Sequence, residues 1–274
     1  MKLLVLFLSI LISLASASKY SKLLVTANLR NASSFVLDLQ KQIVCADFPD
    51  FPIRDVAGAS GGLLKQKYPF VCNGNGAEAI NQCFLYRNDQ WTSSLILPPQ
   101  DIFSRMVALN DTTVWITGGF GNSSLSILVN PMENRILYGP KLRRGVIDHC
   151  MVNIDGNNVF IISGDQHHHK DLRHTQVYKF SSNVWQDGPD LLQTALVPAC
   201  ALVTLSSGKR IIVVADDLTT QYLELGAGTG WRYGPPIPYY IPQPTMVPID
   251  DNGSALLFGF GTGTKILRYS RLSI

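Results

Sequence analysis

The residues best suited to chemistry lie in the stretch 160–189, which contains an unusual group of histidines: His167, His168, His169 and His174. Imidazole nitrogens bind zinc and other transition metals, so this group raises the question of a metal site. A functional site normally adds carboxylates or thiols held on rigid elements, and the candidates here are Asp165, Asp171 and His149. Consecutive histidines do not point at one centre unless their loop folds back. We therefore expect an exposed polar loop, with no metal and no other cofactor.

A possible nucleophile is Ser60, because the residues 58–62 (GASGG) match the pattern G-x-S-x-G. That pattern needs a strand before the serine and a helix after it. The following residues, LLKQKYPFVCNG, continue as strand instead. The glycines of 226–231 and 259–264 are also followed by no helix, so they do not form a phosphate cradle. The sequence therefore predicts no catalytic residue.

The elements that must position these residues are short strands. The chain has 22 glycines and 15 prolines set among Val, Ile, Leu and Tyr, which is typical of many strands joined by turns. Helical periodicity is absent after the first residues, so the fold class is all-β. The formal net charge is +3 without a basic stripe along the sequence, and nucleic acid is therefore not an expected partner.

The N-terminus has the layout of a secretory signal peptide. Lys2 precedes an apolar run from Leu3 to Leu14, and Ala15-Ser16-Ala17 supplies a small-residue cleavage site. We predict a signal peptide over 1–17 and a secreted, extracellular mature chain. The alternative is an uncleaved anchor, but the run is shorter than the ~20 residues that span a bilayer. No later segment is long and apolar enough for a membrane span.

Four Asn-x-Ser/Thr sequons agree with secretion, and each lies in a polar, turn-like stretch. The glycosylation sites that they predict are Asn31, Asn110, Asn122 and Asn252.

A repeat of about 45 residues runs through the chain. In each unit a short apolar strand ends in a pair of small or polar residues, and these pairs begin at Ala27, Gly74, Gly118, Gly164, Ala215 and Gly259. Each pair is followed by a polar loop, a strand with an apolar or aromatic centre, a turn and a further strand. Another strand precedes it. Four short strands (A to D) repeated at this spacing predict a β-propeller blade.

The repeat resembles the kelch repeat, in which Gly-Gly follows an apolar strand and Tyr and Trp come later. Gly118-Gly119 is the full glycine doublet, and the aromatic pairs are Tyr86/Trp91, Tyr178/Trp185 and Tyr222/Trp231. The resemblance covers residues 18–274 and implies one kelch-like propeller domain with about six four-stranded blades. The closing seam is expected to be irregular, because the first unit lacks strand A and the last lacks strand D. Tryptophan-aspartate repeats fit less well, since no unit has their Gly-His or Trp-Asp pair.

The repeat frame favours two disulfides in a secreted chain of five cysteines. Cys72 and Cys83 face each other across strands B and C of one blade. Cys150 and Cys200 lie at matching points of strand A in neighbouring blades. Cys45 is left over, and the sequence alone leaves other pairings open.

The same frame suggests a binding surface, because the B–C loops and the loops between blades share one face of a propeller. The histidine loop and the inter-blade loop 236–244 would lie there, so the candidate binding residues are His167, His168, His169, Tyr239 and Tyr240. Of the sequons, Asn31 and Asn122 fall on this face, and Asn110 and Asn252 on the opposite one. The alternative for the two tyrosines is packing between blades.

Three functions remain open from the sequence. The first is a secreted, non-catalytic module that binds an extracellular protein, which is the usual role of scaffolds resembling this one. The second is an extracellular enzyme, since some kelch-type propellers carry copper-radical oxidase chemistry that gathers Tyr, His and Cys at the axis. The third is a lectin-like module that binds a glycan. The sequence favours the non-catalytic module.

Overall fold

The structure is a computed structural model, and every regular element in its described residues is a β-strand. The described residues are 48–53, 58–65, 67–72, 81–98, 102–164, 172–215, 217–228, 230–241, 243–248 and 253–258, together with the backbone of the strands at either end of the chain. The chain divides into two compact units. The N-terminal unit holds Phe7–Ser16 and Tyr20–Ile147, and the C-terminal unit holds mainly Asp148–Ile274.

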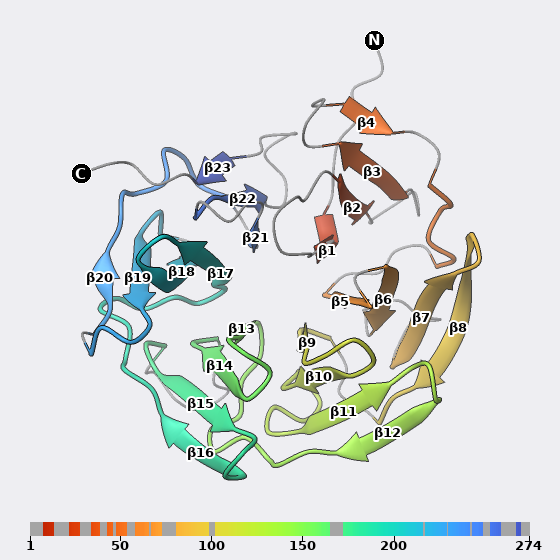
Figure 1. Cartoon of the computed structure of the whole chain (residues 1–274), viewed down its shortest axis with the longest axis horizontal. Helices are drawn as coiled ribbons and strands as arrows, with labels where there is room; N and C mark the ends of the chain where they lie inside the picture. The colour runs from red at the N-terminus through yellow and green to blue at the C-terminus, as the bar shows by residue number, and fades with distance from the viewer. Residues whose placement is uncertain are drawn as a thin grey trace. The chain divides into compact units, whose positions relative to one another are not determined.

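The N-terminal unit contains three antiparallel four-stranded sheets (Figure 1). The first is β1 (Leu8–Ser13), β2 (Lys22–Ala27), β3 (Ser34–Asp38) and β4 (Ile43–Cys45). The second is β5 (Ser60–Leu64), β6 (Tyr68–Cys72), β7 (Gln82–Arg87) and β8 (Gln90–Ile96). The third is β9 (Arg105–Ala108), β10 (Val114–Thr117), β11 (Ser126–Asn130) and β12 (Arg135–Tyr138). The first strands of successive sheets lie side by side, β1 beside β5 and β5 beside β9.

The C-terminal unit repeats this arrangement. One sheet is β13 (Cys150–Asn153), β14 (Asn158–Ile162), β15 (Thr175–Lys179) and β16 (Val184–Asp187). The next is β17 (Ala199–Leu205), β18 (Gly208–Val214), β19 (Thr220–Glu224) and β20 (Arg232–Tyr233). The last has three strands, β21 (Thr245–Pro248), β22 (Ala255–Phe258) and β23 (Leu267–Tyr269). Again the first strands are neighbours, with β13 beside β17 and β17 beside β21 (Figure 1).

The expected number of about six regular blades needs correction. Where side chains are described, four sheets are complete four-stranded blades: β5–β8, β9–β12, β13–β16 and β17–β20. The β21–β23 sheet has three strands, because no fourth strand follows β23 in the described residues. The sheet at the start has four strands only by using β1, which lies within the predicted signal peptide.

Packing between sheets explains why the second strand of each blade is mostly apolar. All four residues of β10 are buried, and Trp115 has no exposed surface. A strand buried on both faces cannot alternate apolar and polar residues, so it reads as a continuous apolar run. In the N-terminal unit, one core cluster joins side chains of the β5–β8 and β9–β12 blades, among them Phe70, Leu85, Ile116 and Ile127.

The predicted tyrosine–tryptophan pairs are cross-strand partners. Tyr86 lies opposite Trp91 with ring centroids 5.3 Å apart, and Tyr178 lies opposite Trp185 at 5.0 Å. Burial raises the pKa of the Tyr178 hydroxyl, which hydrogen-bonds Asn183. The third pair differs, because Tyr222 lies opposite Arg232. Tyr222 and Trp231 are therefore not cross-strand partners.

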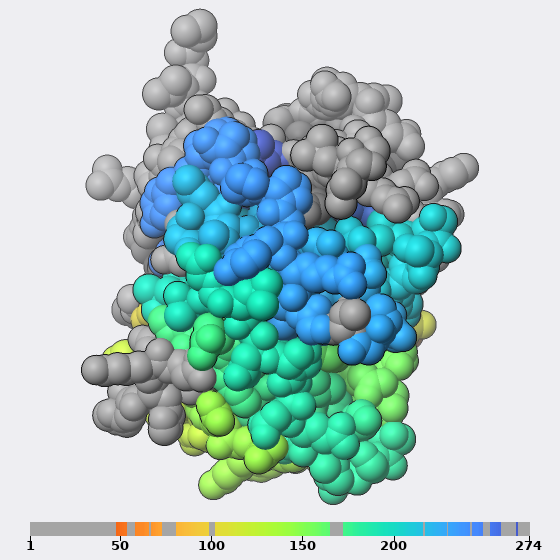
Figure 2. Space-filling model, turned by 90° about the vertical axis from the view of Figure 1, so that its left-hand side faces the viewer, coloured from red at the N-terminus to blue at the C-terminus, as the bar shows by residue number. Residues whose placement is uncertain are grey.

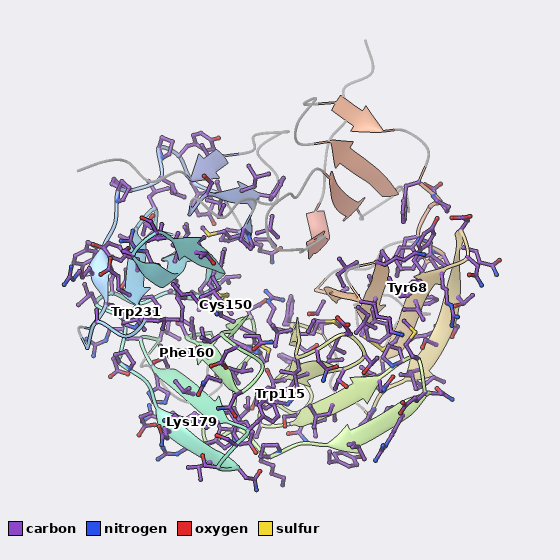
Figure 3. The ribbon with its side chains drawn as sticks, viewed as in Figure 1. Tyr68, Trp115, Cys150, Phe160, Lys179 and Trp231 are labelled. Carbon is purple, nitrogen blue, oxygen red and sulfur yellow. A yellow bond between two sulfur atoms is a disulfide. The ribbon has the colours of Figure 1, made fainter. Side chains whose placement is uncertain are left out.

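Two of the tryptophans connect their blade to the preceding segment. Nε1 of Trp91 donates to the carbonyl oxygen of Pro49 at 3.2 Å. Nε1 of Trp231, which is labelled in Figure 3, donates to the carbonyl oxygen of Pro189 at 2.7 Å. Trp231 is buried in the core cluster that also contains Cys150 and Cys200. The tryptophan thus fills space between neighbouring blades and also satisfies a carbonyl group there.

Both favoured disulfides are present. Cys72 and Cys83 are direct cross-strand partners on β6 and β7, with Cα atoms 4.1 Å apart. Cys150 on β13 (Figure 3) is joined to Cys200 on β17, with Cα atoms 5.9 Å apart. This second bond links neighbouring blades of the C-terminal unit across a sequence separation of 50. The side chain of Cys45 lies outside the described residues.

Candidate binding surface

Strand register brings several loops to one end of the C-terminal unit. Ile162 pairs with Thr175, Gln176 pairs with Asp187, and Val214 pairs with both Ala199 and Thr220. The segments that leave or enter these residues therefore lie at the same end of their blades. We call the described part of this end, residues 188–197, 217–219 and 234–241, the loop surface of the C-terminal unit. Figure 2 shows the segment around 230–245 as a blue band across one side of this unit.

The loop surface exposes large apolar side chains beside buried ones. Leu192, Leu196 and Tyr240 have 43 %, 42 % and 53 % of their surface exposed. Their chain neighbours Leu191, Ala195 and Ile241 are buried in the core clusters. Each exposed side chain therefore follows or precedes a residue that is fixed by packing. Apolar side chains held in this way are typical of contact surfaces, because binding costs them little conformational entropy.

Hydrogen bonds hold the loops in place. The buried side chain of Gln221 accepts from the backbone nitrogens of Leu192 and Gln193 at 2.7 and 3.2 Å, and its Nε2 donates to the carbonyl oxygen of Gln193 at 3.0 Å. The Gln193 side chain donates to Asp217. The nitrogen of Ile237 donates to the carbonyl oxygen of Leu218 at 3.0 Å. A single network thus connects the three segments of the loop surface.

His174 is the histidine that the structure describes near this surface. Its side chain is 4 % exposed and lies between two half-exposed carboxylates. Nε2 is 3.5 Å from Oδ1 of Asp187, and Nδ1 is 3.4 Å from Oδ1 of Asp190. This geometry suits an imidazole that links the start of β15 to the end of β16. In the described residues, no group of three or more His, Cys, Asp or Glu is arranged to hold a metal ion.

The predicted binding residues divide between described and undescribed parts of the chain. Tyr240 is exposed, whereas Tyr239 is half buried and packs against the core cluster of β17, β18 and β22. The packing alternative therefore applies to Tyr239 alone. His167, His168 and His169 lie outside the described residues, as do Asp165 and Asp171.

Other predicted residues are described in part. Asn110 and Asn122 are exposed, and Oδ1 of Asn110 accepts from the nitrogens of Thr112 and Thr113, both at 2.9 Å. Asn31 and Asn252 lie outside the described residues, and glycosylation of all four sites stays a prediction. Ser60 is the buried first residue of β5, a strand followed by another strand, so the helix of a nucleophile elbow is missing.

The oxidase alternative depends on cysteine thiols near His149. His149 is fully buried next to β13. Cys150 and Cys200 are joined to each other, so neither offers a free thiol to such chemistry.

Sequence reasoning missed Leu192, Leu196 and the role of His174. The fragment DLLQTAL (190–196) could have drawn attention to this segment, because it places three leucines in a connection between strands. Which leucine packs inward depends on the hydrogen bond from the nitrogen of Leu191 to the carbonyl oxygen of Arg173, at 2.8 Å. That contact joins residues distant in sequence and leaves no local pattern.

Comparison with known proteins supports the fold. No protein-family model matches the sequence, and no curated protein matches it. The chain is similar to a solved structure titled "Structure of YjhT", with a TM-score of 0.75 and 12 % sequence identity. The match covers 98 % of this chain and 99 % of that chain. At this identity the likeness shows the fold alone, which is an all-β propeller.

Proposed function

We propose that this chain is a secreted, kelch-like propeller that binds another extracellular protein through the loop surface of its C-terminal unit. The observation that carries the proposal is the exposure of Leu192, Leu196 and Tyr240 on loops whose neighbouring residues are buried and hydrogen-bonded. At protein interfaces a few residues contribute most of the binding energy, and tyrosine is among the types enriched there, so Tyr240 is the main candidate. Leu192 and Leu196 would add buried apolar area around it. The surface is therefore pre-organised to bind a partner that has a complementary apolar patch.

The extracellular setting is supported by the cysteines. Both disulfides favoured by the sequence are formed, and disulfides persist mainly in oxidising compartments. Among the described residues, none belongs to a helix with the length and hydrophobicity needed to cross a bilayer. Secretion and glycosylation at Asn31, Asn110, Asn122 and Asn252 remain part of the proposal.

The test is capture of the partner with matched surface variants. Glycosylated protein from cultured cells is crosslinked in native extracellular fluid, and the captured protein is then produced and its Kd measured. The test variant is Leu192→Ser/Tyr240→Ser. The control is Val184→Ser/Tyr138→Ser, which removes an aliphatic and an aromatic side chain, 44 % and 73 % exposed, from outer strands outside the loop surface.

We expect one dominant partner whose affinity falls at least about tenfold in the test variant, because each lost apolar contact is worth on the order of 1 kcal/mol. The control should bind as the wild type does. Equal losses in both variants would reject the loop surface, and capture of no specific protein would reject the function. A third variant, His167→Ala/His168→Ala/His169→Ala, shows whether the histidine loop belongs to the same surface.

A further inference from the structure

The N-terminal unit carries a second exposed surface, and its chemistry is different. In the β9–β12 blade, Thr117 pairs with Ser126 and Ile127 pairs with Tyr138. The loop 118–125 and the connection 139–147 therefore emerge at the same end of the blade. Phe120 is 54 % exposed on the first segment, and Lys141, Arg143 and Arg144 are exposed on the second. We call these four residues the basic surface.

The two segments are fastened to each other along their length. The nitrogen of Gly119 donates to the carbonyl oxygen of Val146 at 3.1 Å. The nitrogen of Val146 donates to the carbonyl oxygen of Ser123 at 2.8 Å. The nitrogen of Leu142 donates to the carbonyl oxygen of Ser124 at 3.0 Å. Leu142 and Val146 are buried. The basic side chains thus project from a fixed backbone on either side of buried anchors.

The two segments approach closely at Gly145, where there is no room for a side chain. A Cβ atom added to Gly145 would lie 2.2 Å from Oγ of Ser123 and 2.9 Å from Oγ of Ser124. The nitrogen of Phe120 also donates to the carbonyl oxygen of Ile102, at 3.0 Å. Phe120 is therefore held beside the connection that carries the three cations.

Charge at this end of the blade is mainly positive, and the nearest acidic residue in sequence is Asp148, directly after the connection. Within residues 117–147 the acidic residue is Glu133, and it lies in the turn between β11 and β12 at the far end of the strands. Arginine guanidinium groups bind sulfate and carboxylate groups through paired hydrogen bonds. A short run rich in Lys and Arg is also the pattern of patches that bind heparin. One exposed aromatic ring among three cations suits the apolar face of a sugar better than it suits a peptide, which would need a wider apolar groove.

We propose that the basic surface binds a sulfated glycosaminoglycan chain, with Lys141, Arg143 and Arg144 contacting its anionic groups and Phe120 contacting a sugar ring. This site is separate in chemistry and in residues from the protein-binding surface proposed above. It would hold the secreted protein at extracellular matrix while the other surface stays available.

The probe is an immobilised heparin octasaccharide, with binding measured on the full secreted chain at several salt concentrations. The test variant is Arg143→Ala/Arg144→Ala. Its matched control, Arg87→Ala/Arg135→Ala, removes the same charge from exposed arginines at the opposite end of blades in the same unit. Each protein is also measured after enzymatic removal of N-linked glycans, because Asn122 is exposed and lies two residues from Phe120.

We expect the test variant to bind about tenfold more weakly and with a shallower salt dependence, since two ionic contacts are lost. The control should change affinity less than threefold. Phe120→Ala should weaken binding about threefold and leave the salt dependence unchanged, because the ring carries no charge. Equal weakening by test and control variants would overturn the site. If poly-glutamate or a single-stranded oligonucleotide competes equally well, the ligand class is rejected. Absence of binding at low salt would reject both the site and its ligand class.

Discussion

At the scale of single residues, left-handed backbone positions decide how two of the described blades turn from their second strand to their third. Gly118 and Gly119 have φ values of 65° and 111°, and Ser163 and Gly164 have 55° and 93°. The small pair of the β13–β16 blade is therefore Ser163-Gly164, one residue earlier than the sequence alignment indicates. A serine accepts this conformation at a cost, since φ > 0 disfavours any residue with a Cβ.

Hydrogen bonding explains why a serine stands at position 163. Its side chain is buried and its Oγ contacts the carbonyl oxygens of Leu172 and Ala195, which belong to two different loops. We expect Ser163→Ala to lower the free energy of unfolding by about 2 kcal/mol, because buried carbonyl groups lose their donor. Ser163→Gly should lower it by only about 1 kcal/mol, since relief of the left-handed strain offsets part of the loss. Urea unfolding of both variants measures the difference. A larger loss for glycine than for alanine would show that backbone strain at Ser163 is unimportant.

At the scale of elements, two blades (β9–β12 and β13–β16) tie the segment after the outer strand to the start of the strand beside it. Oγ of Ser126 donates to the carbonyl oxygen of Pro140, and Oγ1 of Thr175 donates to that of Pro189, both at 2.8 Å. A glycine precedes each proline, and its nitrogen donates to the carbonyl oxygen of the same Ser or Thr. In these two blades the Gly-Pro is thus a structural clamp that fixes the point where the chain leaves for the next blade. At Gly234-Pro235 the backbone bond from the Gly234 nitrogen to the Thr220 carbonyl oxygen is also present, at 2.7 Å.

This clamp requires glycine for reasons of space. A Cβ atom on Gly188 would lie 2.3 Å from Oγ1 of Thr175 and 3.3 Å from both Cβ of Thr175 and Cγ2 of Val177. Gly188→Ala should therefore lower the free energy of unfolding by about 2–3 kcal/mol through overpacking. Gly230→Ala is the matched control, since nothing lies within 4 Å of its added Cβ and it should change stability by less than about 0.5 kcal/mol. Thermal unfolding of the two variants compares them, and equal stability would mean that the clamp yields at little cost.

At the scale of the whole molecule, the sequence predicted the features that are set by residues close together along the chain. The repeat spacing, the tyrosine–tryptophan pairs and the Cys72–Cys83 bond follow from short hairpins, whose register local pattern sets. The exposure of Leu192 or Phe120 depends on backbone hydrogen bonds between separate loops, so no sequence period reveals it. The number of regular blades was misjudged for a related reason. A repeat shows that a unit exists but does not fix the number of strands in its sheet. The last sheet has three strands, and the first has four only with β1, which lies in the predicted signal peptide.

At the N-terminus, the same residues form a strand of the first sheet and belong to the predicted signal peptide, which cleavage would remove. β1 (Leu8–Ser13) pairs antiparallel with β2, for example Leu11 with Val25. The same residues form the apolar run of the predicted signal peptide. Signal peptidase needs small residues at its cleavage site, and Ala15-Ser16-Ala17 supplies them.

We therefore expect the protein secreted by cultured cells to begin at Ser18, so that β2 becomes the first strand of a three-stranded sheet. N-terminal sequencing and the intact mass after glycan removal test this directly. Ala17→Arg should block cleavage and leave the uncleaved form in the cell, because a bulky charged residue does not fit the cleavage site. A secreted wild-type chain that begins at Met1 would instead mean that β1 belongs to the mature fold and completes the first sheet by pairing with β2.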